Sequence, residues 1–313
     1  MELRPDHYLS GHSVGVALRH VSVDQPGTGG SAWIPGWKPE DTVDDAAEFL
    51  RLRGITEPVL LEGWSWGSTM ALLFAQRHPR LVRGIVIGGM WTNTRKEVRA
   101  YLDADGARAW MPGWTEQFSV FTNGHGSACD LHRAIREGAG GGTLAEAYDA
   151  AESEQAGSGQ IPRQPLPGPI PRVSSPTPVD METESDETIR FAYIESEMMC
   201  RGQRGIWRLR LQFPRRLASV PLVVIQGRYD QVCLPETAQR VVRAWPGSRK
   251  LLVPMNGGHG SFRSPRREDL ERAGVSLPAE QQWALEKAAM LSYGNGGLLK
   301  RAALECLAGA GQQ

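Results

Sequence analysis

The residues best suited to chemistry begin with a serine set between two glycines. Residues 63–67 read Gly-Trp-Ser-Trp-Gly, a G-x-S-x-G motif between an apolar stretch typical of a strand and a stretch with helical periodicity. A tight strand-to-helix turn of this kind lifts the serine hydroxyl above the edge of a sheet. We therefore predict Ser65 as a nucleophile and the backbone amide of Trp66 as an oxyanion donor. Taken alone, the motif also fits an ordinary serine in a glycine-rich turn.

A serine nucleophile requires a base and an acid, and candidates for both follow later predicted strands. Asp230 comes directly after an apolar run that ends at residue 227, and His259 follows a run that ends at residue 255. Serine, acid and histidine thus occur in the chain order that this type of hydrolase uses. The other six histidines all precede Asp230. We predict a triad in which Asp230 orients His259 and His259 removes the proton of Ser65.

The elements that must position these residues alternate between strand and helix. Strands are predicted at residues 14–24, 58–63, 82–89, 220–227 and 250–255, and helices at residues 42–53, 69–77 and 235–245. Such alternation is typical of a mostly parallel sheet with helices on both faces. Two further helices, at residues 279–293 and 298–307, are expected to pack on the same sheet.

The alternation stops in the middle of the chain. Aromatic residues near 110–121 suggest helices, whereas residues 138–142 and the Pro/Ser-rich stretch 156–184 suggest loops or low-complexity sequence. We interpret residues 97–216 as a cap inserted into one α/β domain. The first part of that core would be residues 1–96, and the second part residues 217–313.

Composition limits the kind of partner. Lys plus Arg and Asp plus Glu both total 35, so no net field would attract nucleic acid or a membrane surface. A peptide or another small molecule is the expected partner, and the oligomeric state is left open. We expect a cytoplasmic protein, since no stretch approaches the roughly 20 apolar residues of a membrane span and the first ten residues lack an apolar signal core. The spacing of the four cysteines argues against a zinc site or a disulfide scaffold and favours a reducing compartment: Cys129, Cys200, Cys233 and Cys306.

Several segments together resemble one known family. They are DQPGTGGS at 24–31, GWSWGSTMALLFAQRHPRLV at 63–82, QGRYDQVCLPETA at 226–238, AWPG at 244–247 and NGGHGSF at 256–262. They are similar to the proline iminopeptidases, also called prolyl aminopeptidases. This resemblance implies the α/β-hydrolase fold with an inserted helical cap. It also implies a serine peptidase that releases N-terminal proline from peptides, without a metal or cofactor.

The resemblance also suggests residues that would bind substrate. The segment FAYIE at 191–195 is similar to the family's cap segment, in which a glutamate meets the terminal amine of the substrate, so Glu195 is the candidate. A cationic imino group entering a partly desolvated pocket needs such a carboxylate. Glu152 or Glu154 could supply the family's second cap glutamate. Trp64 could line a pyrrolidine pocket, although tryptophan there is also ordinary packing.

The sequence departs from the family upstream of residue 24. The family carries a His-Gly-Gly-Pro-Gly loop there that supplies a second oxyanion donor, and residues 1–13 are too short to hold it with the preceding strands. We therefore expect the N-terminal strands of the fold to be missing. Pro26 and Gly30 also stand where the family usually has arginine. Two alternatives stay open: an esterase with the same triad, and a weak or inactive relative.

Overall fold

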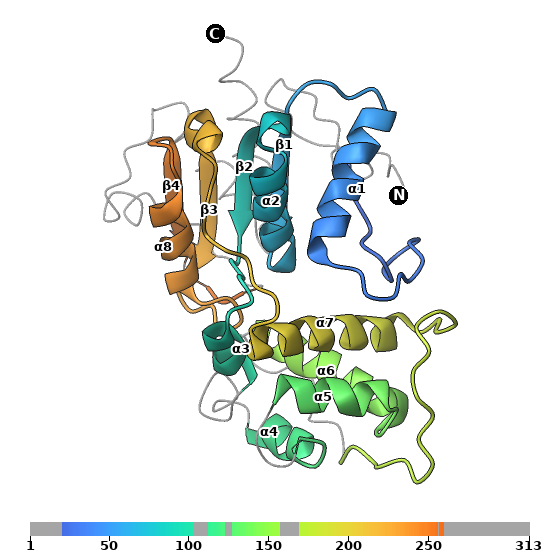
Figure 1. The fold of residues 1–313 in the computed structure, drawn as a ribbon. Helices are drawn as coiled ribbons and strands as arrows, with labels where there is room; N and C mark the ends of the chain where they lie inside the picture. Colours follow the sequence, from blue (N-terminus) through green and yellow to red (C-terminus); the bar gives the residue numbers. More distant parts are fainter. Residues whose placement is uncertain (1–20, 103–111, 123–126, 157–168, 256, 260–313) are drawn as a thin grey trace, which may run out of the picture. The chain divides into compact units, whose positions relative to one another are not determined.

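The computed structural model describes residues 21–102, 112–122, 127–156, 169–255 and 257–259 (Figure 1). These residues form two compact units. Unit 1 comprises residues 21–24, 36–91 and 211–259, and unit 2 comprises residues 25–35 and 92–210, each within the described ranges. The short segment 25–35 belongs with the inserted residues, which the sequence patterns did not indicate.

Unit 1 contains four parallel strands in the order β1-β2-β3-β4. Their bounds are β1 Val59–Trp64, β2 Val82–Gly88, β3 Leu222–Gly227 and β4 Lys250–Met255. Because all neighbours pair in parallel, the carboxyl ends of the strands meet at one edge of the sheet. The candidate residues at 65, 230 and 259 all follow carboxyl ends of these strands.

Helices of unit 1 lie beside the sheet, and local features of the sequence explain where they begin. They are α1 Pro39–Leu52, α2 Trp66–Arg77 and α8 Pro235–Ala244, with short 3-10 turns η1 Pro79–Leu81 and η3 Arg215–Ser219. α2 packs on β1 and β2, and α8 packs on β3 and β4 (Figure 1). Proline at the start of α1 and α8 fixes a helical φ where no amide partner is needed. The core of this unit includes three fully buried residues, Leu72 of α2, Ile85 of β2 and Val224 of β3.

Most of the predicted core elements are confirmed with small shifts at their ends. The helix predicted at 69–77 begins three residues earlier, at Trp66, because the turn at the serine leads directly into it. Residues 21–24 do not form the predicted strand, and the rest of that strand lies outside the described residues. Two other predictions concern residues outside the described part: that N-terminal strands are missing, and that two helices form at residues 279–293 and 298–307.

Unit 2 is helical. Its elements are α3 Arg95–Leu102, α4 Pro112–Ser119, α5 Ala128–Arg136, α6 Gly141–Ala156 and α7 Glu187–Arg204. The side chain of Asp186 accepts hydrogen bonds from two amides at the start of α7, and Gly205, in the left-handed conformation, ends that helix. Residues 169–184 contain neither helix nor strand, as predicted. The cap boundaries at 96/97 and 216/217 stay predictions.

α5, α6 and α7 pack around an apolar cluster. Its most deeply buried large members are Phe118, Leu131, Leu144 and Tyr148, each at most 2% exposed. None of the helices in the described part of the chain combines the length and apolar composition needed to cross a bilayer.

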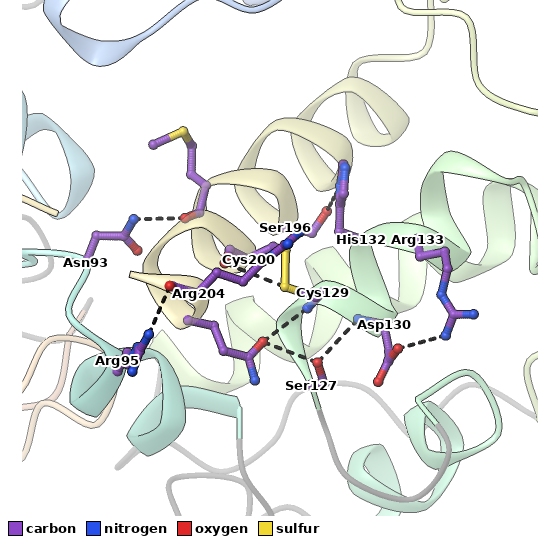
Figure 2. The surroundings of a disulfide bond; sticks show 12 residues. Asn93, Arg95, Ser127, Cys129, Asp130, His132, Arg133, Ser196, Cys200 and Arg204 are labelled. Carbon is purple, nitrogen blue, oxygen red and sulfur yellow. Dashed lines mark hydrogen bonds and ion pairs between the residues drawn. A yellow bond between two sulfur atoms is a disulfide. The ribbon is translucent and has the colours of Figure 1, made fainter. Parts of the chain in front are cut away.

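A disulfide between Cys129 and Cys200 joins α5 to α7 (Figure 2). The expectation that these cysteines are unpaired is therefore wrong. They are 71 residues apart in sequence, and only the antiparallel packing of two distant helices brings them together. Beside the bridge, Gln203 Oε1 accepts hydrogen bonds from Ser127 Oγ and the Cys129 amide, both at 3.2 Å. Because disulfides persist mainly in oxidising compartments, the cytoplasmic location stays a prediction.

Removing this bridge should destabilise unit 2. Closing a loop of this length restricts the unfolded chain, so its loss should lower the free energy of unfolding by about 2–4 kcal/mol. We expect a reductant to lower the unfolding temperature of the wild type, measured by circular dichroism. A Cys129→Ser/Cys200→Ser variant should already unfold at the lower temperature and should not respond to reductant. A wild type whose bridge is reduced, by thiol titration, without any change in unfolding temperature would contradict this prediction.

Candidate active site

Ser65 occupies a strained turn between β1 and α2. Its backbone has φ 53° and ψ −123°, a conformation with positive φ that residues other than glycine rarely adopt. The turn is so tight that a Cβ on Gly63 would lie 2.2 Å from the Gly67 carbonyl oxygen. The Ser65 amide donates a 3.0 Å hydrogen bond to the Gly88 carbonyl of β2. These contacts explain why the motif needs glycine before the serine, and they place Ser65 at the carboxyl edge of the sheet.

The serine is also tied to the start of α2. The Ser68 amide and the Ser68 hydroxyl donate to the Ser65 carbonyl oxygen, at 3.0 and 2.5 Å. Trp66 is the first residue of the helix, and the first backbone N–H groups of a helix point outward from its N-terminus without a partner in the helix. A negative charge is favoured at such an end. The oxyanion role of Trp66 stays a prediction, as does any role of residues upstream of 21, which lie outside the described part.

Asp230 follows β3 and is almost completely buried, with 3% of its surface exposed. Its Oδ1 accepts hydrogen bonds from the amides of Val232 (3.0 Å) and Cys233 (2.7 Å). Its Oδ2 lies 2.9 Å from His259 Nδ1 and accepts a 3.0 Å hydrogen bond from Gln226 Nε2. Since a carboxylate only accepts hydrogen bonds, His259 must donate its Nδ1–H, which leaves Nε2 as the basic nitrogen. The structure therefore brings together the predicted acid and base in the orientation that a triad requires.

The loop after β4 carries His259 across the end of β3. A Cβ on Gly227 would lie 2.6 Å from the Gly258 carbonyl oxygen, so only glycine permits the loop to pass this closely. The Tyr229 amide donates to the Gly257 carbonyl at 3.1 Å and holds the loop in place. The ring of His259 then lies 6.2 Å from that of Trp64, centroid to centroid. Trp64 thus packs beside the base, and its predicted contact with substrate stays a prediction.

Ser65 and His259 share this edge of unit 1, but the described residues include no hydrogen bond between them. Ser65 Oγ lies 3.9 Å from Cys233 Sγ, and Cys233 is buried and forms no disulfide. In unliganded active sites the hydrogen bond from nucleophile to base is often long and shortens when substrate binds. The arrangement places an oriented imidazole and a strained serine on loops at the same edge of the sheet.

Unit 2 contains two neighbouring glutamates, one of which is the predicted amine-binding residue. Glu195 lies on α7, and its carboxyl lies close to the side chains of Glu152 and Tyr148 of α6. Oε2 of Glu195 is buried without a hydrogen-bond partner among the described residues. Burial of Glu195 and the neighbouring Glu152 carboxyl both raise the pKa of Glu195 and so favour its protonated form. We call these two residues the acid pair.

The sequence left the second glutamate open between Glu152 and Glu154. The structure joins Glu152 to Glu195, whereas the side chain of Glu154 lies outside the described part. Helical periodicity in the sequence could have favoured Glu152 over Glu154. Tyr148 and Glu152 are four residues apart and therefore lie on one face of α6.

The acid pair should make the stability of unit 2 depend on pH. Burial raises the pKa of Glu195 well above its ordinary value of 4.5, and the negative charge of Glu152 adds to this effect. The folded protein therefore keeps a proton that the unfolded chain releases, and the free energy of unfolding falls as the pH rises above 4.5 through the raised pKa. We expect Glu195→Gln to unfold at a higher temperature than the wild type at pH 8.

The stabilisation of Glu195→Gln should shrink toward pH 4, where the wild-type carboxyl is protonated in both states. Thermal melts over pH 4–9 measure this difference. Glu146→Gln, an exposed residue of the same helix as Glu152, is the matched control and should show no such trend. An equal difference at every pH would show that the titration of Glu195 is not its cause.

Comparison with known proteins gives one family and a consistent set of relatives. A family model of the alpha/beta hydrolase fold matches residues 17–263. A proline iminopeptidase of Xylella fastidiosa is 27% identical over 252 residues, covering 78% of this chain and 75% of the relative. A proline iminopeptidase of Xanthomonas citri is 26% identical over 261 residues, covering 82% and 79%. The resemblance to proline iminopeptidases is thereby confirmed as a sequence relationship.

Solved structures that are similar to this chain include two esterases. One, from Exiguobacterium antarcticum, is 15% identical, covers 80% of this chain and 78% of its own, and superposes with a TM-score of 0.44. The other, from Thermogutta terrifontis, is 22% identical, covers 84% and 78%, and has a TM-score of 0.36.

Proposed function

The chain belongs to the α/β hydrolase fold family, and from this premise we propose that it is a serine peptidase that releases N-terminal proline from peptides. The fold expected from the sequence is thus confirmed, and the chain is a hydrolase by family. The peptidase activity, its triad and its substrate are our proposal. The observation that supports it best is the buried Asp230–His259 pair at 2.9 Å, beside the strained turn that holds Ser65.

The proposed reaction is an acyl transfer to Ser65. His259 Nε2 takes the proton of the serine hydroxyl as the oxygen attacks the prolyl carbonyl carbon. The amide of Trp66 stabilises the negative oxygen of the tetrahedral intermediate. His259 then protonates the leaving peptide amine, and water, activated by the same imidazole, hydrolyses the prolyl ester to free proline. Asp230 stays ionised throughout and keeps His259 in one tautomer.

The acid pair is the proposed reader of the substrate's terminal amine. A cationic imino group would favour loss of the Glu195 proton to solvent and would pair with the two carboxylates, which compensates their buried charge. The unpartnered Oε2 of Glu195 supports this role, because a buried acceptor without a donor is rare unless a ligand supplies one. The names of the relatives support the same substrate, since each is a proline iminopeptidase.

An assay with paired substrates tests the proposal against the esterase alternative. We expect hydrolysis of a chromogenic proline amide with a free amine, and none once that amine is acylated. An esterase would accept the blocked substrate equally well. A protein that neither turns over these substrates nor reacts with a fluorophosphonate probe would be the inactive relative.

Neutralising one member of the acid pair should lower activity selectively. For Glu195→Gln we expect kcat/KM on the proline amide to fall on the order of 10²-fold, because a buried charge pair with the substrate is lost. Hydrolysis of a small aryl acetate, which has no amine, should change less than threefold. Glu146→Gln is the control and should match the wild type on both substrates. A parallel loss on both substrates would argue against amine recognition by Glu195.

A further inference from the structure

Gln226, the penultimate residue of β3, places a buried amide next to the acid of the triad. Its Oε1 accepts a 3.2 Å hydrogen bond from the Met90 amide, in the segment that follows β2. Its Nε2 donates to Asp230 Oδ2 at 3.0 Å and to the Cys233 carbonyl at 2.9 Å. The side chain therefore links the ends of two neighbouring strands to one carboxylate.

The orientation of this amide is fixed by its neighbours. If the amide were flipped, its oxygen would face Asp230 Oδ2 and the Cys233 carbonyl, which are both acceptors, and its NH₂ would face the Met90 N–H. Only the orientation described here pairs every donor with an acceptor. Gln226 therefore acts as a donor to Asp230.

The oxygen that Gln226 binds is the one that His259 needs. Two backbone amides hold Oδ1 of Asp230, and Gln226 and His259 share Oδ2. Without the amide, only the two hydrogen bonds to Oδ1 would restrain the carboxylate, and the direction in which Oδ2 accepts from His259 would be less narrowly fixed.

We infer that Gln226 is a positioning residue of the triad, which holds Asp230 Oδ2 where His259 Nδ1–H can reach it. The inference rests on the proposed serine mechanism for its effect on turnover. The hydrogen bond between Asp230 and His259 can nevertheless be observed without any reaction, as the strongly downfield proton resonance of His259 Nδ1–H.

Gln226→Met keeps the length of the side chain and removes both hydrogen-bonding groups. We expect the downfield resonance to shift or broaden, and labelling of Ser65 by a fluorophosphonate to slow about tenfold to a hundredfold, the range for losing a hydrogen bond to a charged group. Trp245→Phe is the matched control. It removes another buried hydrogen bond of unit 1, from Trp245 Nε1 to the Val220 carbonyl at 3.1 Å, and should leave resonance and labelling unchanged.

Gln226→Glu separates positioning from packing. The titratable side chains here are Asp230, which Gln226 contacts directly, and His259, which shares Asp230 Oδ2; Cys233 contacts Gln226 and Asp230 through its backbone, and its thiol lies near Ser65. When the new carboxyl is protonated it can still donate to Asp230 Oδ2, and when it ionises the two carboxylates repel each other. We expect the ratio of wild-type to variant labelling rates to rise with pH, by at least tenfold between pH 6 and pH 9. A purely structural contribution would give a constant ratio.

The outcomes distinguish this inference from the proposed function. If Gln226→Met labels normally and keeps the wild-type resonance, the positioning role is wrong. A constant rate ratio for Gln226→Glu would also overturn it. A third outcome is that Ser65 of the wild type is not labelled, although the downfield resonance is present and changes only in the Gln226 variants. In that case the serine mechanism is wrong and the positioning of Asp230 by Gln226 is supported.

Discussion

Ser65→Ala is expected to lower kcat on a proline amide on the order of 10⁶-fold, the scale seen when a serine nucleophile is removed. No other nucleophile can substitute at this position, because the carbonyl must meet an oxygen held above the strand end. The nearby thiol of Cys233 is buried, with 0% of its surface exposed, so a substrate cannot reach it. Steady-state turnover and fluorophosphonate labelling measure the loss.

Ser65→Ala should fold as the wild type does, and Ser65→Gly tests the contribution of the backbone strain. Alanine keeps the strained φ of 53° at residue 65, so Ser65→Ala should unfold near the wild-type temperature. Glycine adopts this conformation without a steric penalty, so Ser65→Gly should be more stable by about 1 kcal/mol and equally inactive. Turnover by Ser65→Ala at the wild-type rate would reject the nucleophile, whatever the melts show.

The position of Ser65 could be predicted because the constraint on it is local. A strand followed at once by a helix leaves only a few residues for the turn, and glycine at 63 is required by a contact only four residues along the chain. Asp230 and His259 could be predicted for a related reason. Parallel strands carry whatever follows them to one edge, so order along the chain translates into proximity in space.

Contacts between residues far apart in the sequence could not be predicted in this way. The bridge from Cys129 to Cys200 depends on how two helices of unit 2 pack, and no local pattern records that packing. Glu152 and Glu195 meet for the same reason. Gln226 was part of a recognised motif, but its function depends on the Met90 amide, which reaches it only through the pairing of β2 with β3.

Asp230→Asn is expected to lower kcat about 10⁴-fold while leaving the fold intact, as when the acid of a serine-protease triad is made an amide. The reason lies in the four hydrogen bonds to the carboxylate. Two backbone amides donate to Oδ1, so the asparagine oxygen must take that position and its NH₂ must replace Oδ2. The NH₂ then faces the NH₂ of Gln226, which costs some stability because both are donors. It also faces His259 Nδ1, and the imidazole can accept only if its proton moves to Nε2. With a proton on Nε2, His259 cannot remove the proton of Ser65.

The same unit offers a matched control for Asp230→Asn. Asp44 also pairs with a histidine, since its Oδ1 lies 2.8 Å from His78 Nε2, and it hydrogen-bonds Arg77 as well. This cluster is partly exposed, so Asp44→Asn should cost no more than about 1 kcal/mol of stability and leave kcat within twofold of the wild type. If Asp230→Asn behaved like Asp44→Asn, Asp230 would be a structural acid and His259 would need another partner. A loss confined to Asp230→Asn would show that the tautomer of His259, and not the stability of the unit, limits the reaction.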